Sequence, residues 1–229
     1  MEPARTDVVP RGALIGWAIL VGAYIALAYA ANAAGDPDPD REVLYEWSTA
    51  AAAIVQYAVM AALVLALARR LTPATLGFRR PRSWAAAAGL VVVSYLAILA
   101  IAGALGTVLD AGEEQGLVPD EWDPDRAAPF VANFAVVVLV APFVEELMFR
   151  GLGYAAVRDA FGSLAAIVAT AVTFGLAHGL LVAFPALAAF GLILGWLRRR
   201  TDSLYPCIVL HALFNGVVLI VAVTTGVGT

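Results

Sequence analysis

Residues 130–157, FVANFAVVVLVAPFVEELMFRGLGYAAV, form an almost unbroken apolar run, and this run decides the fold class. With a rise of about 1.5 Å per residue, a helix over this run is long enough to cross a hydrocarbon core of about 30 Å. Only three of its side chains are charged: Glu145, Glu146 and Arg150. An ionisable side chain at the centre of a bilayer costs at least ~2.5–3.5 kcal/mol, so it usually marks function. The run therefore predicts a membrane-spanning helix that carries a functional site.

Apolar runs of similar length occur along the whole chain. Of its 229 residues, 62% are hydrophobic, whereas globular proteins have roughly 45–50%. The mean hydropathy is +0.86. This composition predicts an all-α, polytopic integral membrane bundle of about seven transmembrane helices, with the lipid bilayer as its solvent. The predicted helices cover residues 13–34, 46–68, 84–109, 130–157, 163–180, 182–197 and 204–223.

We predict a single membrane domain with two parts. Residues 1–127 contain the first three helices and their loops, and residues 128–224 contain the helices with the polar side chains. Within the second part, only residues 179–185 separate the fifth helix from the sixth. Residues 163–197 therefore form either two spans or one broken re-entrant unit.

The first apolar run, residues 13–33, has two interpretations. Arginines precede it and small residues lie near its end, as in a cleaved signal peptide. However, the run is ~20 residues long, whereas the hydrophobic part of a signal peptide has 7–15 residues. More helices also follow it. We therefore predict a first transmembrane helix that is retained.

The arginines predict the orientation in the membrane. All 14 basic residues are arginines, and the predicted helices place 12 of them on one side. Only Arg41 and Arg126 fall on the other side, in acidic loops over residues 36–46 and 110–126. Because positive residues accumulate on the cytoplasmic side, we predict a cytoplasmic N-terminus in the cell membrane. Nothing in the composition favours nucleic acid binding, and no feature of the sequence defines an oligomeric state.

The two adjacent glutamates are predicted to have different functions. Neighbouring residues of a helix point about 100° apart, so Glu145 and Glu146 face different directions. Glu146 stands four residues before Arg150, which is the favourable order for an ion pair along a helix. This spacing predicts a structural pair of Glu146 with Arg150. Glu145 has no such partner and is the better catalytic candidate.

The only two histidines also lie in apolar runs. Phe174 is one turn before His178, and Asn215 is one turn after His211, so each pair shares a helix face. A carboxylate, two imidazoles and an amide in a dry cavity suit hydrolysis. The carboxylate and an imidazole can activate water, and amide or imidazole donors can stabilise an oxyanion. Glycine pairs four residues apart, Gly175 with Gly179 and Gly191 with Gly195, predict close helix packing.

Three motifs together resemble the signature of the CPBP family, the CAAX-processing and bacteriocin-processing membrane peptidases also called Abi proteins. In chain order they are EExxxR at Glu145, Glu146 and Arg150, FxxxH at Phe174 and His178, and HxxxN at His211 and Asn215. The resemblance covers about residues 130–223. It implies an intramembrane endopeptidase that acts on a membrane-associated peptide or protein. Eukaryotic members trim prenylated proteins, whereas bacterial members are tied to peptide maturation, immunity and surface anchoring.

The resemblance also implies a function for each motif residue. Glu145 would activate water together with His178, without a metal or other cofactor. His211 and Asn215 would stabilise the oxyanion, and Glu146 would belong to the same catalytic set. Arg150 and Phe174 would hold these residues in place.

Four alternatives stay open from the residues alone. Glu145, His178 and His211 could hold zinc or another divalent metal, although the HExxH spacing of helical zinc peptidases is absent. Cys207, the single cysteine, lies one turn before His211 and could act as a nucleophile, although an apolar setting disfavours a thiolate. The chain could instead be a non-enzymatic membrane scaffold or bacteriocin-immunity protein. A proton-coupled transporter would show an internal repeat, and none is found.

Overall fold

The computed structural model describes residues 8–35, 42–106, 119 and 122–225, and in these ranges the chain is helical without any strand. Two short elements, η1 (Val43–Tyr45) and η2 (Pro124–Arg126), precede α2 and α5. The longer elements are α1 (Arg11–Ala34), α2 (Trp47–Ala68), α3 (Trp84–Gly106), α5 (Ala127–Ala135), η3 (Val136–Val140), α6 (Ala141–Glu146), η4 (Leu147–Gly153), α7 (Tyr154–Ala177), α8 (Phe184–Thr201) and α9 (Tyr205–Thr225).

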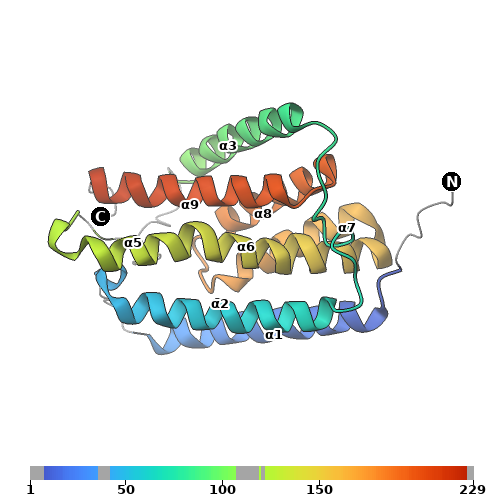
Figure 1. The fold of residues 1–229 in the computed structure, drawn as a ribbon, viewed down its shortest axis with the longest axis horizontal. Coiled ribbons are helices and arrows are strands. Elements are labelled where there is room, and N and C mark those ends of the chain that lie inside the picture. Colours follow the sequence, from blue (N-terminus) through green and yellow to red (C-terminus); the bar gives the residue numbers. More distant parts are fainter. Residues whose placement is uncertain (1–7, 36–41, 107–118, 120–121, 226–229) are drawn as a thin grey trace.

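The long helices run side by side along one axis. α1 and α2 lie on one side of the bundle, and α3 and α9 lie on the other (Figure 1). The run from α5 through α6 passes between them, α7 reverses direction at Gly162 and packs beside η4, and α8 packs against α7, α3 and α9. This arrangement confirms the predicted all-α membrane bundle, and the protein is a multi-pass integral membrane protein.

The predicted number of seven spans is not confirmed. Among the described residues, five helical segments are long and apolar enough to cross a membrane, and one of them is the run over residues 124–177. This run contains both the fourth and the fifth predicted helix. They are separated at Gly162, whose φ of 86° and ψ of 170° are not helical, and glycine adopts this conformation without strain. The chain reverses there, and the ring of Phe174 accordingly packs against that of Phe149 at 5.3 Å. α8 has 18 residues and ends in three arginines, and it is not among the five.

α7 and α8 form a helical hairpin, so the segment that we predicted as either two spans or one broken unit consists of two antiparallel helices. α7 ends at Ala177, and Gly179 then adopts a φ of 73°. A Cβ on Gly179 would lie 3.0 Å from the carbonyl oxygen of Ala28 in α1. This glycine is therefore needed both for the turn and for the close approach of α1.

Glycines bring the two helices of this hairpin close together. A Cβ on Gly191 would lie 2.8 Å from the Cα of Ala171, and one on Gly195 would lie 3.2 Å from the side chain of Ile167. Gly175 of α7 faces the backbone of α8 in the same way, at 3.1 Å from the nitrogen of Ala188. Small residues thus allow the backbones to approach, as predicted for three of the four glycines.

A wide helical turn, η3, leads into the glutamate pair. Pro142 has no N–H and disturbs the regular bonding of the preceding turn. The Ala141 N–H donates to Val136 O, five residues back, and so leaves Val137 O without its α-helical donor. The side chain of Asn215 in α9 fills this position, because its Nδ2 donates to Val137 O at 3.0 Å.

η4 is a second wide turn in which a side chain from another helix bonds to a free carbonyl. At its end, the Tyr154 N–H donates to the carbonyl oxygens of Phe149 and Gly151 and bypasses that of Arg150. Arg198 of α8, whose side chain is 1% exposed, donates from Nε to Arg150 O at 3.2 Å. Each wide turn is therefore locked to a different helix through one side chain.

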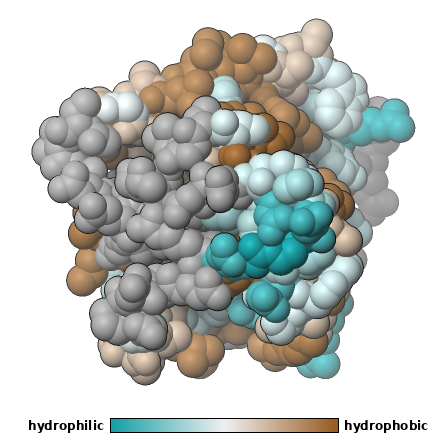
Figure 2. All heavy atoms as spheres, turned by 90° about the vertical axis from the view of Figure 1, so that its left-hand side faces the viewer, coloured by the Kyte–Doolittle hydropathy of each residue, from teal (hydrophilic) through white to brown (hydrophobic). Residues whose placement is uncertain are grey.

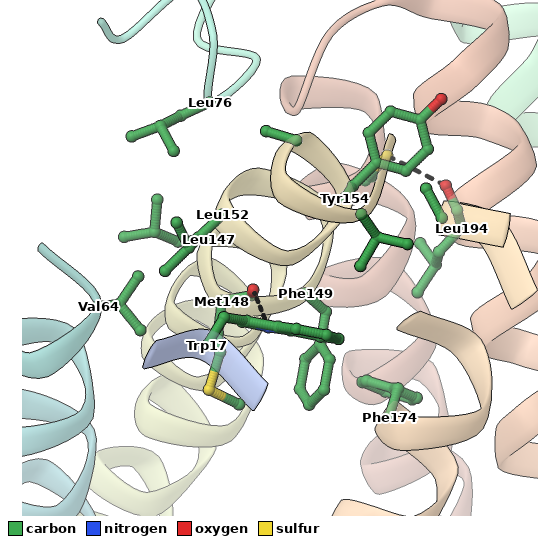
Figure 3. Packing of buried hydrophobic residues seen from close by; sticks show 14 of the residues in the cluster. Trp17, Val64, Leu76, Leu147, Met148, Phe149, Leu152, Tyr154, Phe174 and Leu194 are labelled. Atoms are coloured by element: carbon green, nitrogen blue, oxygen red, sulfur yellow. Dashed lines mark hydrogen bonds between the residues drawn. The ribbon is translucent and has the colours of Figure 1, made fainter. Parts of the chain in front are cut away.

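The buried core surrounds η4 (Figure 3). Leu147, Met148 and Leu152 are at most 2% exposed. Trp17 of α1 donates from its indole nitrogen to Met148 O at 3.1 Å, and a Cβ on Gly153 would lie 2.5 Å from the same indole. α1 is thus an integral part of the core.

The two ends of the bundle carry different charges. The end at which α2 stops and α3 begins holds arginines around Asp202, with Arg79 at 2.8 Å. At the opposite end, Arg126 contacts Asp123 at 2.6 Å and Glu42 at 2.7 Å. Figure 2 faces this second end, where hydrophilic residues gather while the flanks of the bundle are hydrophobic. Arg5, Arg41 and most of the two predicted acidic loops lie outside the described residues.

Candidate active site

Glu146 is at the centre of a buried polar cluster. Its side chain is 0% exposed and follows the wide turn η3 at the end of α6. Its Oε1 accepts a hydrogen bond from Arg150 Nη1 at 3.0 Å, as the sequence spacing predicts. The same oxygen lies 3.0 Å from His211 Nδ1 of α9, a contact that the sequence did not predict. Glu146 therefore connects the α6–η4 segment to α9.

Arg150 completes this buried ion pair. It is also 0% exposed, and its Nη2 donates to Gly191 O in α8 at 3.0 Å. Its guanidinium carbon lies 4.5 Å from the centre of the Phe174 ring, which is a favourable cation–π distance. A buried ion pair needs such additional contacts because removing both charges from water is costly.

Glu145 faces a different environment from Glu146, as expected from their angular separation. Its side chain is 13% exposed, so solvent or a substrate can reach it. The Tyr57 hydroxyl of α2 donates to its Oε1 at 2.8 Å. Its Oε2 lies 3.8 Å from His211 Nε2, which is too long for a hydrogen bond but within ion-pair distance. Glu145 is thus the accessible carboxylate of the cluster.

His211 lies between the two glutamates, with one ring nitrogen towards each. While Glu146 is ionised it can only accept, so Nδ1 of His211 carries a proton and donates. Nε2 then faces Glu145. The imidazole is 3% exposed, and the rings of Phe190 and Phe174 pack edge-on against it with centroids at 5.1 and 5.7 Å. These contacts fix the orientation of the ring.

His178 is placed differently from the prediction. It caps the end of α7 and is exposed, whereas the sequence placed it inside an apolar helix. The reason is the turn at Gly179, which ends the helix early. Nδ1 of His178 lies 2.9 Å from Phe174 O, and the two rings pack at 4.7 Å. Among the described residues its Nε2 has no hydrogen-bond partner, so this nitrogen is available to a substrate or to water.

Phe174 connects the two histidines. Its ring, which is 1% exposed, contacts the rings of His178 and His211 and the guanidinium of Arg150. Asn215 lies one turn beyond His211 on α9, and its contact with Val137 O places it beside the wide turn that precedes the glutamates. All the predicted site residues therefore belong to one region of the bundle, although no direct contact joins His178 to Glu145 in the described residues.

Tyr57 is a contact of Glu145 that the sequence analysis missed. It lies in α2, and the neighbouring Gln56 donates to the hydroxyl of Tyr24 in α1 at 3.0 Å. A signal was present, because Gln56 and Tyr57 are adjacent polar side chains in an otherwise apolar run. Polar groups inside membrane helices face partners or cavities. The same principle that selected the glutamates applies to this pair.

Two alternative chemistries, a metal centre and a cysteine nucleophile, depend on the placement of other side chains. Within the described ranges, no three His, Cys, Asp or Glu side chains are grouped so that they could hold a metal ion. Cys207 is 0% exposed, and its thiol lies 3.5 Å from Leu194 O. Such a thiol is inaccessible to a substrate in this structure.

Residues 127–217 match the family described as type II CAAX prenyl endopeptidase, Rce1-like. This segment is similar to the CAAX protease family over about two fifths of the chain. The matched residues begin at α5 and end in α9, and they contain every motif residue from Glu145 to Asn215. The family consists of proteases, so the chain carries a hydrolase domain and acts on a peptide or protein. Neither the curated proteins nor the solved structures contain a significant match to the chain.

Proposed function

We propose that the protein is an intramembrane endopeptidase in which Glu145 is the general base. Its accessible carboxylate would take a proton from a water molecule that attacks the peptide carbonyl of a membrane-associated substrate. Tyr57 donates to one oxygen of Glu145 and so orients the carboxylate. His178, with a free Nε2 at the end of α7, would share the transferred proton and pass it to the leaving amine.

His211 and Asn215 would stabilise the negative charge that develops on the carbonyl oxygen. Glu146 accepts the Nδ1 proton of His211, so Nε2 would donate to the oxyanion in the imidazolium form, in which both ring nitrogens carry a proton. Nδ2 of Asn215 would release Val137 O and donate to the oxyanion instead. Preorganised donors of this kind are typically worth ~2.7–4 kcal/mol each in the transition state.

The observation that carries the proposal is the arrangement of His211 between two glutamates of unequal exposure. Among the residues that the structure describes, the 0% exposed Glu146 is neutralised by Arg150, whereas the 13% exposed Glu145 has no cation at hydrogen-bond distance. One carboxylate is thus structural and the other is free to react. Proteases that use water directly require this kind of accessible base beside a donor.

The test begins with the substrate. Membrane and secreted peptides are compared by proteomics between cells that carry the wild type and cells that carry Glu145→Ala. A peptide that accumulates unprocessed is then offered to the purified protein in detergent. We expect Glu145→Gln to abolish cleavage while the yield of folded protein stays normal, because glutamine still accepts from Tyr57 but cannot take a proton. Glu46→Gln, at an exposed position before α2, is the matched control and should cleave normally.

Two outcomes would contradict the proposal. Normal cleavage by Glu145→Gln would exclude it as the base. If no peptide accumulates and Glu145→Ala still complements a deletion phenotype, the non-enzymatic scaffold takes the place of the peptidase.

We further propose that the N-terminus is cytoplasmic and that the protein lies in the cell membrane. The support is the concentration of arginines at the end of the bundle where α1 begins, α2 stops and α8 ends. Reporter fusions after Arg80 and Arg200 should therefore be cytoplasmic, and a fusion near Pro119 should be external. A cytoplasmic signal at Pro119 would refute this orientation.

A further inference from the structure

A cavity of about 370 Å³ lies outside the candidate active site, at the arginine-rich end of the bundle. It is formed where the segment before α3 and the first turns of α3 meet the end of α8. The candidate active site uses none of its lining residues. Polar lining residues come from both sides of the cavity and include Arg82, Ser83, Arg199, Arg200 and Asp202.

The cavity carries unbalanced positive charge. Asp202 is its one acidic lining residue, and arginines outside the cavity already neutralise it. Arg79 lies 2.8 Å from one carboxylate oxygen, and Arg198 lies 3.1 Å from the other.

In the described part of the chain, none of the three lining arginines has an ion-pair partner, namely Arg82, Arg199 and Arg200. Arg200 lies over the ring of Trp196 instead. The guanidinium groups of Arg82 and Arg199 are therefore the two that favour an anion.

Two further features favour a phosphate group. Ser83 caps α3 by accepting from the Ala86 N–H at 3.2 Å, so the positive end of this 23-residue helix lies at the cavity. Guanidinium groups bind phosphate through pairs of parallel N–H donors. Two guanidinium groups beside a helix N-terminus therefore offer a phosphate group both positive charge and hydrogen-bond donors.

Aromatic side chains place the cavity at the level of lipid headgroups. Trp84 is 55% exposed, and its ring packs at 6.2 Å against that of Tyr205 at the start of α9. Trp196 of α8 is also exposed, and Arg200 lies over its ring at 5.9 Å. Tryptophan and tyrosine accumulate at the interface between membrane and water.

The surface next to the cavity is apolar over the length of an acyl chain. On α3, Val93 and Leu96 point within about 80° of the lining residue Ala86 around the helix, and both are at least 59% exposed. From Ala86 to Leu96 the helix rises by about 15 Å, which is half of a hydrocarbon core of about 30 Å. A lipid tail can therefore lie along α3 while its headgroup occupies the cavity.

We propose that this cavity binds the phosphodiester headgroup of an anionic phospholipid, with Arg82 and Arg199 as its ligands and the acyl chains along α3. Because the site is separate from the glutamates and histidines, the proposal does not depend on peptidase activity.

The test uses the full chain purified in a neutral detergent. It is titrated with dioctanoyl phosphatidylglycerol, with dioctanoyl phosphatidylcholine as the zwitterionic comparison, and with inorganic phosphate as the free anion. Native mass spectrometry measures the fraction of protein that retains a bound ligand. We expect phosphatidylglycerol to bind more tightly than the other two ligands.

The decisive comparison is between two double variants of equal charge. Arg82→Gln/Arg199→Gln should weaken phosphatidylglycerol binding about 30-fold. Each basic residue near an anionic lipid strengthens binding about fivefold, and the two factors multiply. Arg69→Gln/Arg70→Gln removes two arginines from the same end of the bundle that do not line the cavity, and it should change binding less than about twofold. If the first double variant does not give a monodisperse protein, Arg82→Gln and Arg199→Gln are measured singly, each with about a fivefold loss.

Three results would overturn the proposal. Equal losses in the two double variants would show attraction by the total charge of this end and no specific site. Equal binding of phosphatidylcholine would remove the preference for an anionic headgroup. Displacement of the lipid by inorganic phosphate at equal concentration would identify a site for free phosphate.

Discussion

Replacement of Arg150 by methionine tests whether the buried ion pair holds the candidate site together. Methionine retains most of the volume of the side chain but removes its charge and all its donors. The change leaves the buried Glu146 carboxylate without its cation, so that among the described residues it keeps the contact with His211 alone. The hydrogen bond from Nη2 to Gly191 O is lost as well. It also removes the guanidinium from the face of the Phe174 ring.

The size of the effect follows from the burial of both partners at 0% exposure. Removing one partner of a buried pair typically costs about 3–5 kcal/mol, because the remaining charge is left uncompensated. A loss of this size is a large share of a total stability of roughly 5–15 kcal/mol. We therefore expect Arg150→Met to lower the folded yield sharply.

The double variant Glu146→Gln/Arg150→Met separates two contributions to the loss of stability, the uncompensated charge of Glu146 and the lost contacts of Arg150. Glutamine still offers an oxygen to His211 Nδ1 but brings no charge. We expect the double variant to be roughly 1–3 kcal/mol more stable than Arg150→Met alone. Arg69→Met, at an exposed position after α2, is the control and should change stability by less than about 0.5 kcal/mol.

The assay is unfolding of the purified protein in mixed detergent micelles, with a rising fraction of dodecyl sulfate and tryptophan fluorescence as the signal. Trp17 is a suitable reporter because its indole bonds to Met148 O, next to the altered position. The reasoning is refuted if Arg150→Met is as stable as the wild type. It is also refuted if the double variant is less stable than Arg150→Met.

The remaining predictions concern catalysis by the purified protein. Asn215→Ala should lower turnover roughly 10²–10³-fold by removing one oxyanion donor, and an unchanged turnover number would exclude that function. Cleavage should survive strong chelation, and activity that is lost and then returns with zinc would instead make Glu145, His178 and His211 metal ligands. Cys207→Ala should leave the cleavage rate near normal because the thiol is buried, and a complete loss in a folded variant would support the nucleophile alternative.

Much of the fold could be predicted from the sequence because the bilayer imposes a strong pattern. The predicted helices at 13–34 and 46–68 agree with α1 and α2 within two residues at each end. The number of spans could not be obtained in this way. Hydropathy identifies apolar runs but does not show which of them cross the membrane, and the predicted span over 182–197 forms α8, which is not among the five candidate spans. Pro142 lies inside the predicted helix over 130–157 and is accommodated there because Asn215 of α9 satisfies the freed carbonyl of Val137.

The candidate site was predictable to the extent that its chemistry depends on spacing along a helix. The four-residue step from Glu146 to Arg150 and the step from Phe174 to His178 both correspond to contacts in the structure. Contacts between helices were not predictable. The bond of Tyr57 to Glu145 spans 88 positions, and that of His211 to Glu146 spans 65.

The amino-acid sequence was sufficient to establish that this chain spans the membrane and to select a few polar side chains in residues 130–223 as candidates for its chemistry. The physical reason is that burying a charge in lipid is so costly that each such residue stands out in an apolar run. Only the tertiary structure decided which glutamate is neutralised and which is accessible. That distinction depends on the lateral packing of α2, α8 and α9 around the α6–η4 turn, and helical periodicity specifies the face of a residue without specifying its neighbour.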